Sequence, residues 1–275
     1  MKRDSPAYCR RTLRKDNATM LLTIDIGNTN VVAVIYDAKK TQCFSQRFPT
    51  IKEDARAFYS NWLKTDVLPL MGEFPLTGYC ISCVVPIITE DVRSSIEEIL
   101  HIQGINVSTN TVPEFIIHLT HPNELGADFI ATAFGAMAKY ELPIILADLG
   151  SATKISVLNE KGEFEGGIIS PGVGISIDAL NRFIPHLPEI KMEVPATVIG
   201  KDTVTSMQSG WLYGTIASVE GLADKIEREL GKKCIRVLTG GYSISLHPSF
   251  SGFAFDEFLL NEGLYEIYHK THGSF

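Results

Sequence analysis

A chain of 275 residues with 45% hydrophobic and 21% charged side chains has the composition of an ordinary soluble protein of one or two domains. Its formal net charge of -7 argues against nucleic acid as a partner, because nucleic-acid-binding proteins usually present a basic face. No apolar run approaches the roughly 18 residues that a membrane span requires, and no secretory segment is evident. We therefore expect a cytoplasmic protein with no membrane or nucleic-acid partner.

Residues 1–19 differ in character from the rest of the chain. They are rich in lysine and arginine and show almost no apolar periodicity, whereas Met20 begins the first strand pattern. We expect a disordered extension here, with Met20 as a candidate start of the protein.

Two apolar runs around a short acidic turn, D-I-G-N-T-N at 25–30, form the first regular pattern. The runs predict strands at 21–26 and 31–37. The glycine lets the backbone approach a ligand closely, and turn N–H groups can form a concave site for anions. The aspartate would repel a phosphate unless a divalent cation lay between them, so the turn predicts a metal–nucleotide site. An ordinary hairpin turn is the alternative.

The remainder of the first half alternates between strand and helix patterns. A strand is expected at 43–48, a helix at 55–63 and a strand at 75–85, and a helix capped by Thr89 should run to about residue 100. A short strand at 106–109 and a helix at 126–139 follow. The last strand before Pro86 holds Cys80 and Cys83 at CxxC spacing, but no second pair completes a zinc site, so we interpret it as buried.

The second half repeats the layout of the first. A strand at 143–147 leads into D-L-G-S-A-T at 148–153, and strands at 153–158 and 164–170 follow. The remaining elements are helices near 177–184, 206–230 and 256–270 and a strand at 235–238. This repetition indicates an internal duplication of about 120 residues, hence two similar lobes, 20–140 and 141–275, with a cleft between them.

The duplicated layout resembles the superfamily of acetate and sugar kinases, actin and heat-shock chaperone ATPases. Five blocks narrow the match to type III pantothenate kinase, a family that also includes proteins named as accessory factors for toxin gene expression. The blocks are D-I-G-N-T-N (25–30), E-L-G-A-D (124–128), D-L-G-S-A-T (148–153), G-G-I-I-S-P-G (166–172) and G-K-D-T-V-T-S-M-Q-S-G (200–210). The resemblance implies an α/β fold of two ribonuclease-H-like, actin-like ATPase lobes, each a mixed sheet flanked by helices.

The resemblance also implies a reaction, the ATP-dependent phosphorylation of pantothenate to 4′-phosphopantothenate, the first step of coenzyme A biosynthesis. The cofactors would be ATP, Mg2+ and K+ or NH4+, and the protein would be a homodimer. ATP would be bound by Asp25, Ile26, Gly27, Asn28, Thr29, Asn30, Val31, Val32 and Ser151. Pantothenate would be bound by Gly126, Ala127, Asp128, Phe129 and Thr203. Asp128 would be the general base, Asp148 would hold the monovalent cation, and Thr239–Gly241 would lie near the adenosine.

The chain departs from the family pattern around the expected acceptor site. Where the family has an arginine after the aspartate and a tyrosine upstream, this chain has Phe129 and Leu119. The second phosphate motif of the family reads D-x-G-T-A-T-T, whereas Ser151 and Lys154 stand here. A lost charged contact to the substrate carboxylate costs about 1.5–3 kcal/mol. Two alternatives follow: a nucleotide-binding regulatory relative with altered or lost kinase activity, or a kinase for a related small alcohol.

Overall fold

The computed structural model describes residues 19–72 and 75–272, so nearly all of the extension expected at 1–19 lies outside the described residues. The chain forms two compact units. Unit 1 comprises the described residues up to Phe115, then His121–Ala138 and the C-terminal stretch from Leu260. Unit 2 comprises Ile116–Thr120 and Lys139–Leu259.

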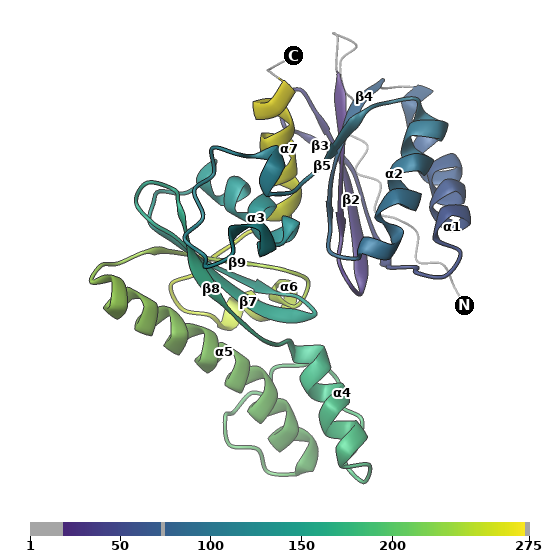
Figure 1. The fold of residues 1–275 in the computed structure, drawn as a ribbon. Coiled ribbons are helices and arrows are strands. Elements are labelled where there is room, and N and C mark those ends of the chain that lie inside the picture. The colour runs from purple at the N-terminus through teal and green to yellow at the C-terminus, as the bar shows by residue number, and fades with distance from the viewer. Residues whose placement is uncertain (1–18, 73–74, 273–275) are drawn as a thin grey trace. The chain divides into compact units, whose positions relative to one another are not determined.

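Unit 1 is built on a five-stranded mixed sheet with the strand order β3-β2-β1-β4-β5 (Figure 1). β1 pairs antiparallel with β2, and β2 with β3, whereas β4 lies parallel to β1 and β5 parallel to β4. The strands are β1 (Met20–Ile26), β2 (Asn30–Asp37), β3 (Gln42–Pro49), β4 (Leu76–Cys83) and β5 (Gly104–Asn106). Because β1 and β4 are central, their side chains are buried on both faces of the sheet.

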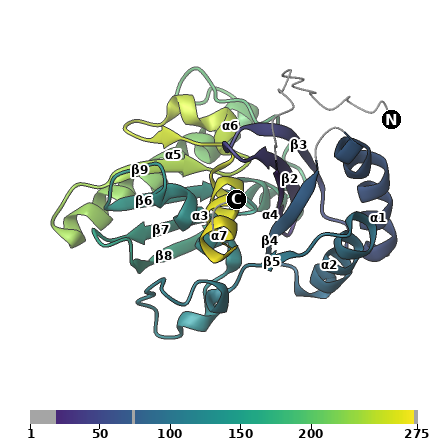
Figure 2. The same ribbon diagram turned by 90° about the horizontal axis from the view of Figure 1, so that it is seen from above.

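Helices cover both faces of this sheet. The helices of unit 1 are α1 (Ala55–Trp62), α2 (Pro86–Leu100), α3 (Ala127–Met137) and α7 (Leu259–His272). Shorter turns are η1 (Leu63–Val67), η2 (Leu68–Gly72), η3 (Thr109–Thr111) and η4 (Pro122–Glu124). Figure 2 shows α1 and α2 on one side of the sheet and α7 on the other. The largest buried side chains under α1 and α2, Tyr59 and Tyr79 among them, form one continuous core with the strands.

Two local expectations in unit 1 are wrong. The second helix starts at Pro86 rather than at Thr89, because a proline at the first helical position loses no bond that the helix would have made. The Thr89 hydroxyl instead donates to the Val85 carbonyl, 3.3 Å away. The short strand expected at 106–109 is shifted to Gly104–Asn106, where it pairs with β4.

The C-terminal helix belongs to unit 1, which differs from the expected division at 140/141. Asn261 is buried, and its amide donates to the carbonyl of Val32 at 3.2 Å and to the hydroxyl of Thr23 at 3.2 Å. The Lys40 ammonium also lies 2.7 Å from the Glu266 carboxylate. These contacts join α7 to β1, to β2 and to the turn between β2 and β3, so the C-terminal helix packs on the first unit.

Unit 2 repeats the topology of unit 1 and confirms the predicted duplication. Its sheet has the order β10-β9-β6-β7-β8, the same pattern when read from β8. The strands are β6 (Ile144–Leu149), β7 (Ala152–Leu158), β8 (Phe164–Pro171), β9 (Ile235–Thr239) and β10 (Ala254–Phe255). The helical segments are α4 (Val173–Phe183), α5 (Thr203–Leu230), α6 (Ser243–Leu246) and η5 (His247–Ser249).

The long helix α5 has strong signals at both ends. Asp202 accepts a bond from the Thr205 N–H at 2.8 Å in a capping box, and Gly231 ends the helix with φ 70°. One apolar face of α5, including Leu212, Val219 and Ala223, packs into the core of unit 2. Among the described residues, no helix combines the length and apolarity needed to cross a lipid bilayer.

Candidate active site

The turn between β1 and β2 is a tightly bonded loop with an acidic side chain at its base. The N–H of Gly27 donates to the Asn30 carbonyl at 3.0 Å, and the Thr50 hydroxyl donates to the Gly27 carbonyl at 2.7 Å. A Cβ on Gly27 would lie 3.1 Å from the Asn30 carbonyl oxygen, so glycine suits this close return of the chain. Asp25 lies half-buried at the end of β1, opposite Val32.

The ATP-binding residues expected in this hairpin include both buried and exposed side chains. Ile26 and Val31 are fully buried, so only their main-chain groups could contact a nucleotide. Asn28, Thr29 and Asn30 are exposed at the tip of the turn. The hairpin therefore offers backbone groups and short polar side chains, which is the surface that a phosphate group requires.

The second acidic hairpin, between β6 and β7, is held by bonds from neighbouring loops of unit 2. The Gly150 N–H donates to the Ala152 carbonyl at 3.1 Å, and the Gly172 N–H donates to the Ser151 carbonyl at 3.1 Å. A Cβ on Gly172 would lie 2.2 Å from that Ser151 oxygen, so only glycine allows the approach. Ser151, the expected ATP contact, is thus fixed in a half-buried turn.

Asp148 forms an ion pair that the sequence reasoning missed. The Lys154 ammonium nitrogen lies 2.6 Å from Oδ2 of Asp148, and each side chain is only 17% exposed. The two residues are directly opposite in the β6–β7 register, which places their side chains on the same face. The sequence does contain a signal for this pair, because an acidic and a basic residue lie at equal distances from the hairpin turn.

The backbone of Gly240 lies against Oδ1, the second oxygen of the Asp148 carboxylate. It follows β9, which is parallel to β6, and has φ 91°. A Cβ at this position would lie 2.3 Å from Oδ1 of Asp148 and 2.7 Å from the Leu149 backbone. The expected Thr239–Gly241 loop therefore lies against the second hairpin within unit 2, and the glycine is required by both its backbone angle and its surroundings.

Asp128, the expected base, lies in the first turn of α3 and is half-buried. Its Oδ1 accepts a bond from the Phe129 N–H at 2.9 Å. A Cβ on Gly126 would lie 2.5 Å from Oδ1 of Asp128, so the glycine leaves room for the carboxylate.

The remaining expected substrate residues lie at helix starts. Ala127 begins α3 and is buried. The side chain of Phe129, the residue after Asp128, is half-buried. Thr203 is the first residue of α5 in unit 2 and is exposed. Leu119, where the resemblance leads us to expect a tyrosine, is half-buried in a bend of unit 2.

The Met-Gln-Ser-Gly block near the start of α5 has a structural role in unit 2. The Gln208 amide donates to the Lys191 carbonyl at 2.9 Å, and the Ser209 hydroxyl donates to the Val198 carbonyl. Both side chains are buried. They anchor the segment that precedes α5, and through it the start of the helix where Thr203 lies.

The cysteine pair lies in the sheet core of unit 1, which confirms the interpretation of its segment as a buried strand. Cys80 is fully buried in β4, and burial raises the pKa of its thiol far above the ordinary value. Burial also raises the pKa of the Cys83 thiol. Both thiols are therefore protonated near neutral pH, which disfavours metal binding or nucleophilic chemistry.

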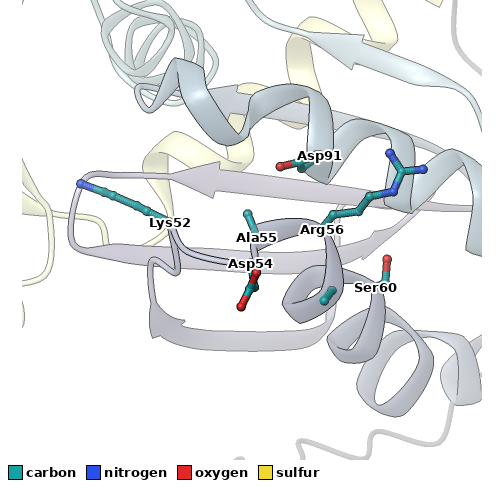
Figure 3. Close-up of a pocket in the computed structure, with 7 residues that line it drawn as sticks. Lys52, Asp54, Ala55, Arg56, Ser60 and Asp91 are labelled. Atoms are coloured by element: carbon teal, nitrogen blue, oxygen red, sulfur yellow. The ribbon is translucent and has the colours of Figure 1, made fainter.

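A surface pocket in unit 1 lies apart from the expected site residues. It has a volume of about 440 Å³ and is lined by Lys52, Asp54, Ala55, Arg56, Ala57, Ser60 and Asp91 (Figure 3). Figure 3 shows the Lys52 side chain extending away from the others. The pocket is open and combines both signs of charge, and it includes none of the expected site residues.

Comparison with known proteins gives one consistent family. Residues 21–225 match the family model described as type III pantothenate kinase. A type III pantothenate kinase of Exiguobacterium sp. is 35% identical over 255 residues, covering 92% of this chain and 99% of that protein. Another, from Roseiflexus sp., is 36% identical over 90% of this chain and 98% of that protein.

Two crystal structures have the same fold as this chain. A conserved Baf family protein from Campylobacter jejuni matches with a TM-score of 0.57 at 19% identity, over 90% of this chain and 96% of that one. The ethanolamine utilization protein EutJ from Carboxydothermus hydrogenoformans matches with a TM-score of 0.52 at 12% identity, over 90% and 89%. At such identities these two likenesses concern the fold alone.

Proposed function

The chain belongs to the type III pantothenate kinase family, and we infer from this membership that it phosphorylates pantothenate with ATP as the phosphoryl donor. The product is 4′-phosphopantothenate, and the reaction is the first step of coenzyme A biosynthesis. The observation that carries this conclusion is the family match over 21–225, which includes both acidic hairpins and Asp128. The duplicated sheets support it, because each places its acidic hairpin at the same point of the same topology.

Asp128 is proposed as the general base of this reaction. A primary alcohol is a weak nucleophile, and a nearby carboxylate that accepts its proton as the new P–O bond forms contributes about 10²–10⁴-fold. The bond from the γ-phosphorus to the bridging oxygen breaks, and ADP leaves. The position of Asp128 in the first turn of α3 supports the role, because the carboxylate is only half-buried there and a substrate hydroxyl can reach it.

Mg2+ is proposed as the ion that accompanies ATP, with Asp25 as its protein ligand. Mg2+ is usually held by one or two carboxylates together with phosphate oxygens and water. The half-buried carboxylate of Asp25 lies at the base of a turn whose tip exposes Asn28 and Thr29, so the oxygen donors fit this ion. The ion would supply charge neutralisation of the transferred phosphoryl group.

The monovalent cation implied at Asp148 does not fit the donors found there. One oxygen of this carboxylate is paired with the Lys154 ammonium, and the other faces Gly240. No step of the reaction is therefore assigned to potassium or ammonium.

A second candidate function arises on the acceptor side. Phe129 places a half-buried aromatic ring beside the proposed base, where the family has a charged side chain. An apolar group there favours an alcohol without a carboxylate, because it cannot bond to one. We therefore keep a kinase for a related small alcohol as the alternative, and a nucleotide-binding regulatory protein as the outcome if no alcohol is phosphorylated.

A homodimer is proposed from the apolar surface of unit 2. Large hydrophobic side chains are exposed on β8, on α4, on the segment before α5 and in the first turn of α5, and Phe183 at 82% is the most exposed of them. The others in this region are Ile169, Ile175, Leu180, Val198, Ile199 and Val204. Association surfaces bury large apolar side chains of this kind, and a second copy of the chain is the partner that the family implies. Phe183→Asp should convert a dimer to a monomer in light scattering.

The cytoplasm is proposed as the site of action. The substrate ATP and the four free cysteines in the described part of the chain are consistent with a reducing compartment.

The function is tested with purified protein, ATP and Mg2+, and with pantothenate or pantothenol as acceptor. Pantothenol carries an alcohol in place of the carboxylate. We expect ADP release to depend on pantothenate, and Asp128→Asn to lower kcat about 10²–10⁴-fold without changing ATP affinity in calorimetry. Faster turnover of pantothenol would favour the alternative kinase, and ATP binding without turnover of either alcohol would favour the regulatory protein.

A further inference from the structure

The Lys154–Asp148 ion pair sets the second acidic hairpin apart from the first. In the β6–β7 hairpin, Asp148 lies directly opposite Lys154, whereas in the β1–β2 hairpin Asp25 lies directly opposite Val32. The first turn closes from Gly27 to Asn30, one residue longer than the Gly150 to Ala152 closure of the second. Two hairpins of the same layout therefore present different cross-strand partners to their aspartates.

The carboxylate of Asp148 is enclosed on both oxygens by its own unit. Oδ2 is 2.6 Å from the Lys154 ammonium nitrogen, at 17% exposure of each side chain. Oδ1 faces the backbone of Gly240, where even a methyl group would lie 2.3 Å away. A free potassium ion at Oδ2 would have to displace the ammonium, or lie beside a second positive charge in a partly buried site where repulsion is weakly screened.

A lysine side chain can supply what a free monovalent cation supplies. Its head group is an ammonium ion carrying one alkyl group, and ammonium is one of the two cations that the family resemblance implies for this aspartate. Tethering makes the contact intramolecular, so the cation is present at a high effective concentration whatever the salt. The pair also neutralises Asp148, which would otherwise repel the phosphates of the nucleotide.

We propose that Lys154 is the built-in monovalent cation of the second hairpin, so that the reaction of this chain needs neither potassium nor ammonium. The proposal rests on the kinase function given above. It makes Lys154 a positioning residue, which acts through Asp148 rather than on the reacting atoms.

The wild-type protein provides the first test. Kinase activity is measured with ATP, Mg2+ and pantothenate in potassium chloride and in tetramethylammonium chloride at matched ionic strength. We expect the same kcat/KM in both salts. Activation by potassium or ammonium over tetramethylammonium would overturn the proposal.

Lys154→Thr restores the residue that the family motif carries at this position and provides the second test. We expect this variant to be activated by potassium about 5- to 150-fold, the usual range for coupling between two ligands. Lys161→Thr is the matched control, because it removes the same charge from an exposed turn of the same sheet. The activity of this control variant should not change with potassium. A folded Lys154→Thr protein whose activity does not rise with potassium would contradict the proposal. If the threonine variant does not fold, Lys154→Met takes its place in the same test.

Melting temperature separates this proposal from the kinase function. A specifically bound ion raises the melting temperature of the folded protein with its concentration. We expect the wild type to melt at the same temperature in both salts and Lys154→Thr to melt higher in potassium chloride. Absence of kinase activity in every salt would refute the kinase function, whereas a potassium-specific rise for the wild type would refute the role of Lys154.

Discussion

Replacing Gly126 by alanine should displace the carboxylate of Asp128 while leaving the fold intact. Gly126 has φ −64° and ψ 147°, angles that alanine adopts without strain. The added Cβ would lie 2.5 Å from Oδ1 of Asp128, whereas ordinary contact begins at 3.4 Å, so the oxygen must move by about 0.9 Å. A carboxylate can do so by rotating its side chain, at the cost of its bond from the Phe129 N–H.

A shift of this size should have a large effect on the catalytic rate and a small effect on the stability of the fold. A misplacement of about 1 Å can cost about 10²-fold in rate. We therefore expect kcat to fall about 10²-fold and the melting temperature to stay near that of the wild type. Gly221→Ala in α5 is the control, because an added Cβ there has nothing within 4 Å. That variant should keep its kcat and gain about 0.5–1 kcal/mol in free energy of unfolding.

A double-mutant cycle decides whether the alanine acts through Asp128. In the Asp128→Asn background, Gly126→Ala should cost little further activity, since the group it displaces has already lost its function. Steady-state kinetics of the four proteins, with denaturation curves for each, measures this coupling. An unchanged kcat for Gly126→Ala, or an equal loss in both backgrounds, would refute the reasoning.

Three further predictions concern the acceptor site, the second hairpin and the acid stability of unit 2. Phe129→Arg should lower the KM for pantothenate about tenfold or more in steady-state kinetics, with little change for pantothenol, because it restores a charged contact. Gly240→Ala should destabilise the protein by about 1–3 kcal/mol in urea denaturation, because it strains a positive φ and clashes with Asp148. Bonds from Arg236 hold the pKa of Glu227 at about 2, below the ordinary 4.5. That stabilisation is complete above pH 4.5 and lost as the pH falls toward 2, so Glu227→Gln should cost about 3 kcal/mol at pH 7 and much less near pH 2, measured by denaturation.

The sequence pattern predicted most of the fold because the strong signals here are local. The alternation of apolar runs and D-x-G turns identified both hairpins, and the two sheets share one strand order. The errors come from weaker signals. The hydroxyl of Thr89 suggests a helix cap, although Pro86 already begins α2. Nothing local in the last helix indicates that Asn261 bonds to β1 and β2, so its unit was not predictable.

Motifs in the sequence propose the site residues but do not give their contacts. The hairpins, Asp128 and Gly240 are proposed from motifs, whereas the Lys154–Asp148 pair depends on the exact strand register. One residue of difference in turn length decides which side chain faces each aspartate. Register is fixed by turn geometry and by burial of one sheet face, which a motif does not report.

The central claim is that this chain transfers a phosphoryl group from ATP to pantothenate. Mass spectrometry of a reaction containing the purified protein, ATP, Mg2+ and pantothenate tests it most directly. We expect 4′-phosphopantothenate and ADP in equal amounts, and about 10²–10⁴-fold less of each from Asp128→Asn over the same period. ADP without phosphorylated pantothenate, or no product at all from folded protein, would contradict it.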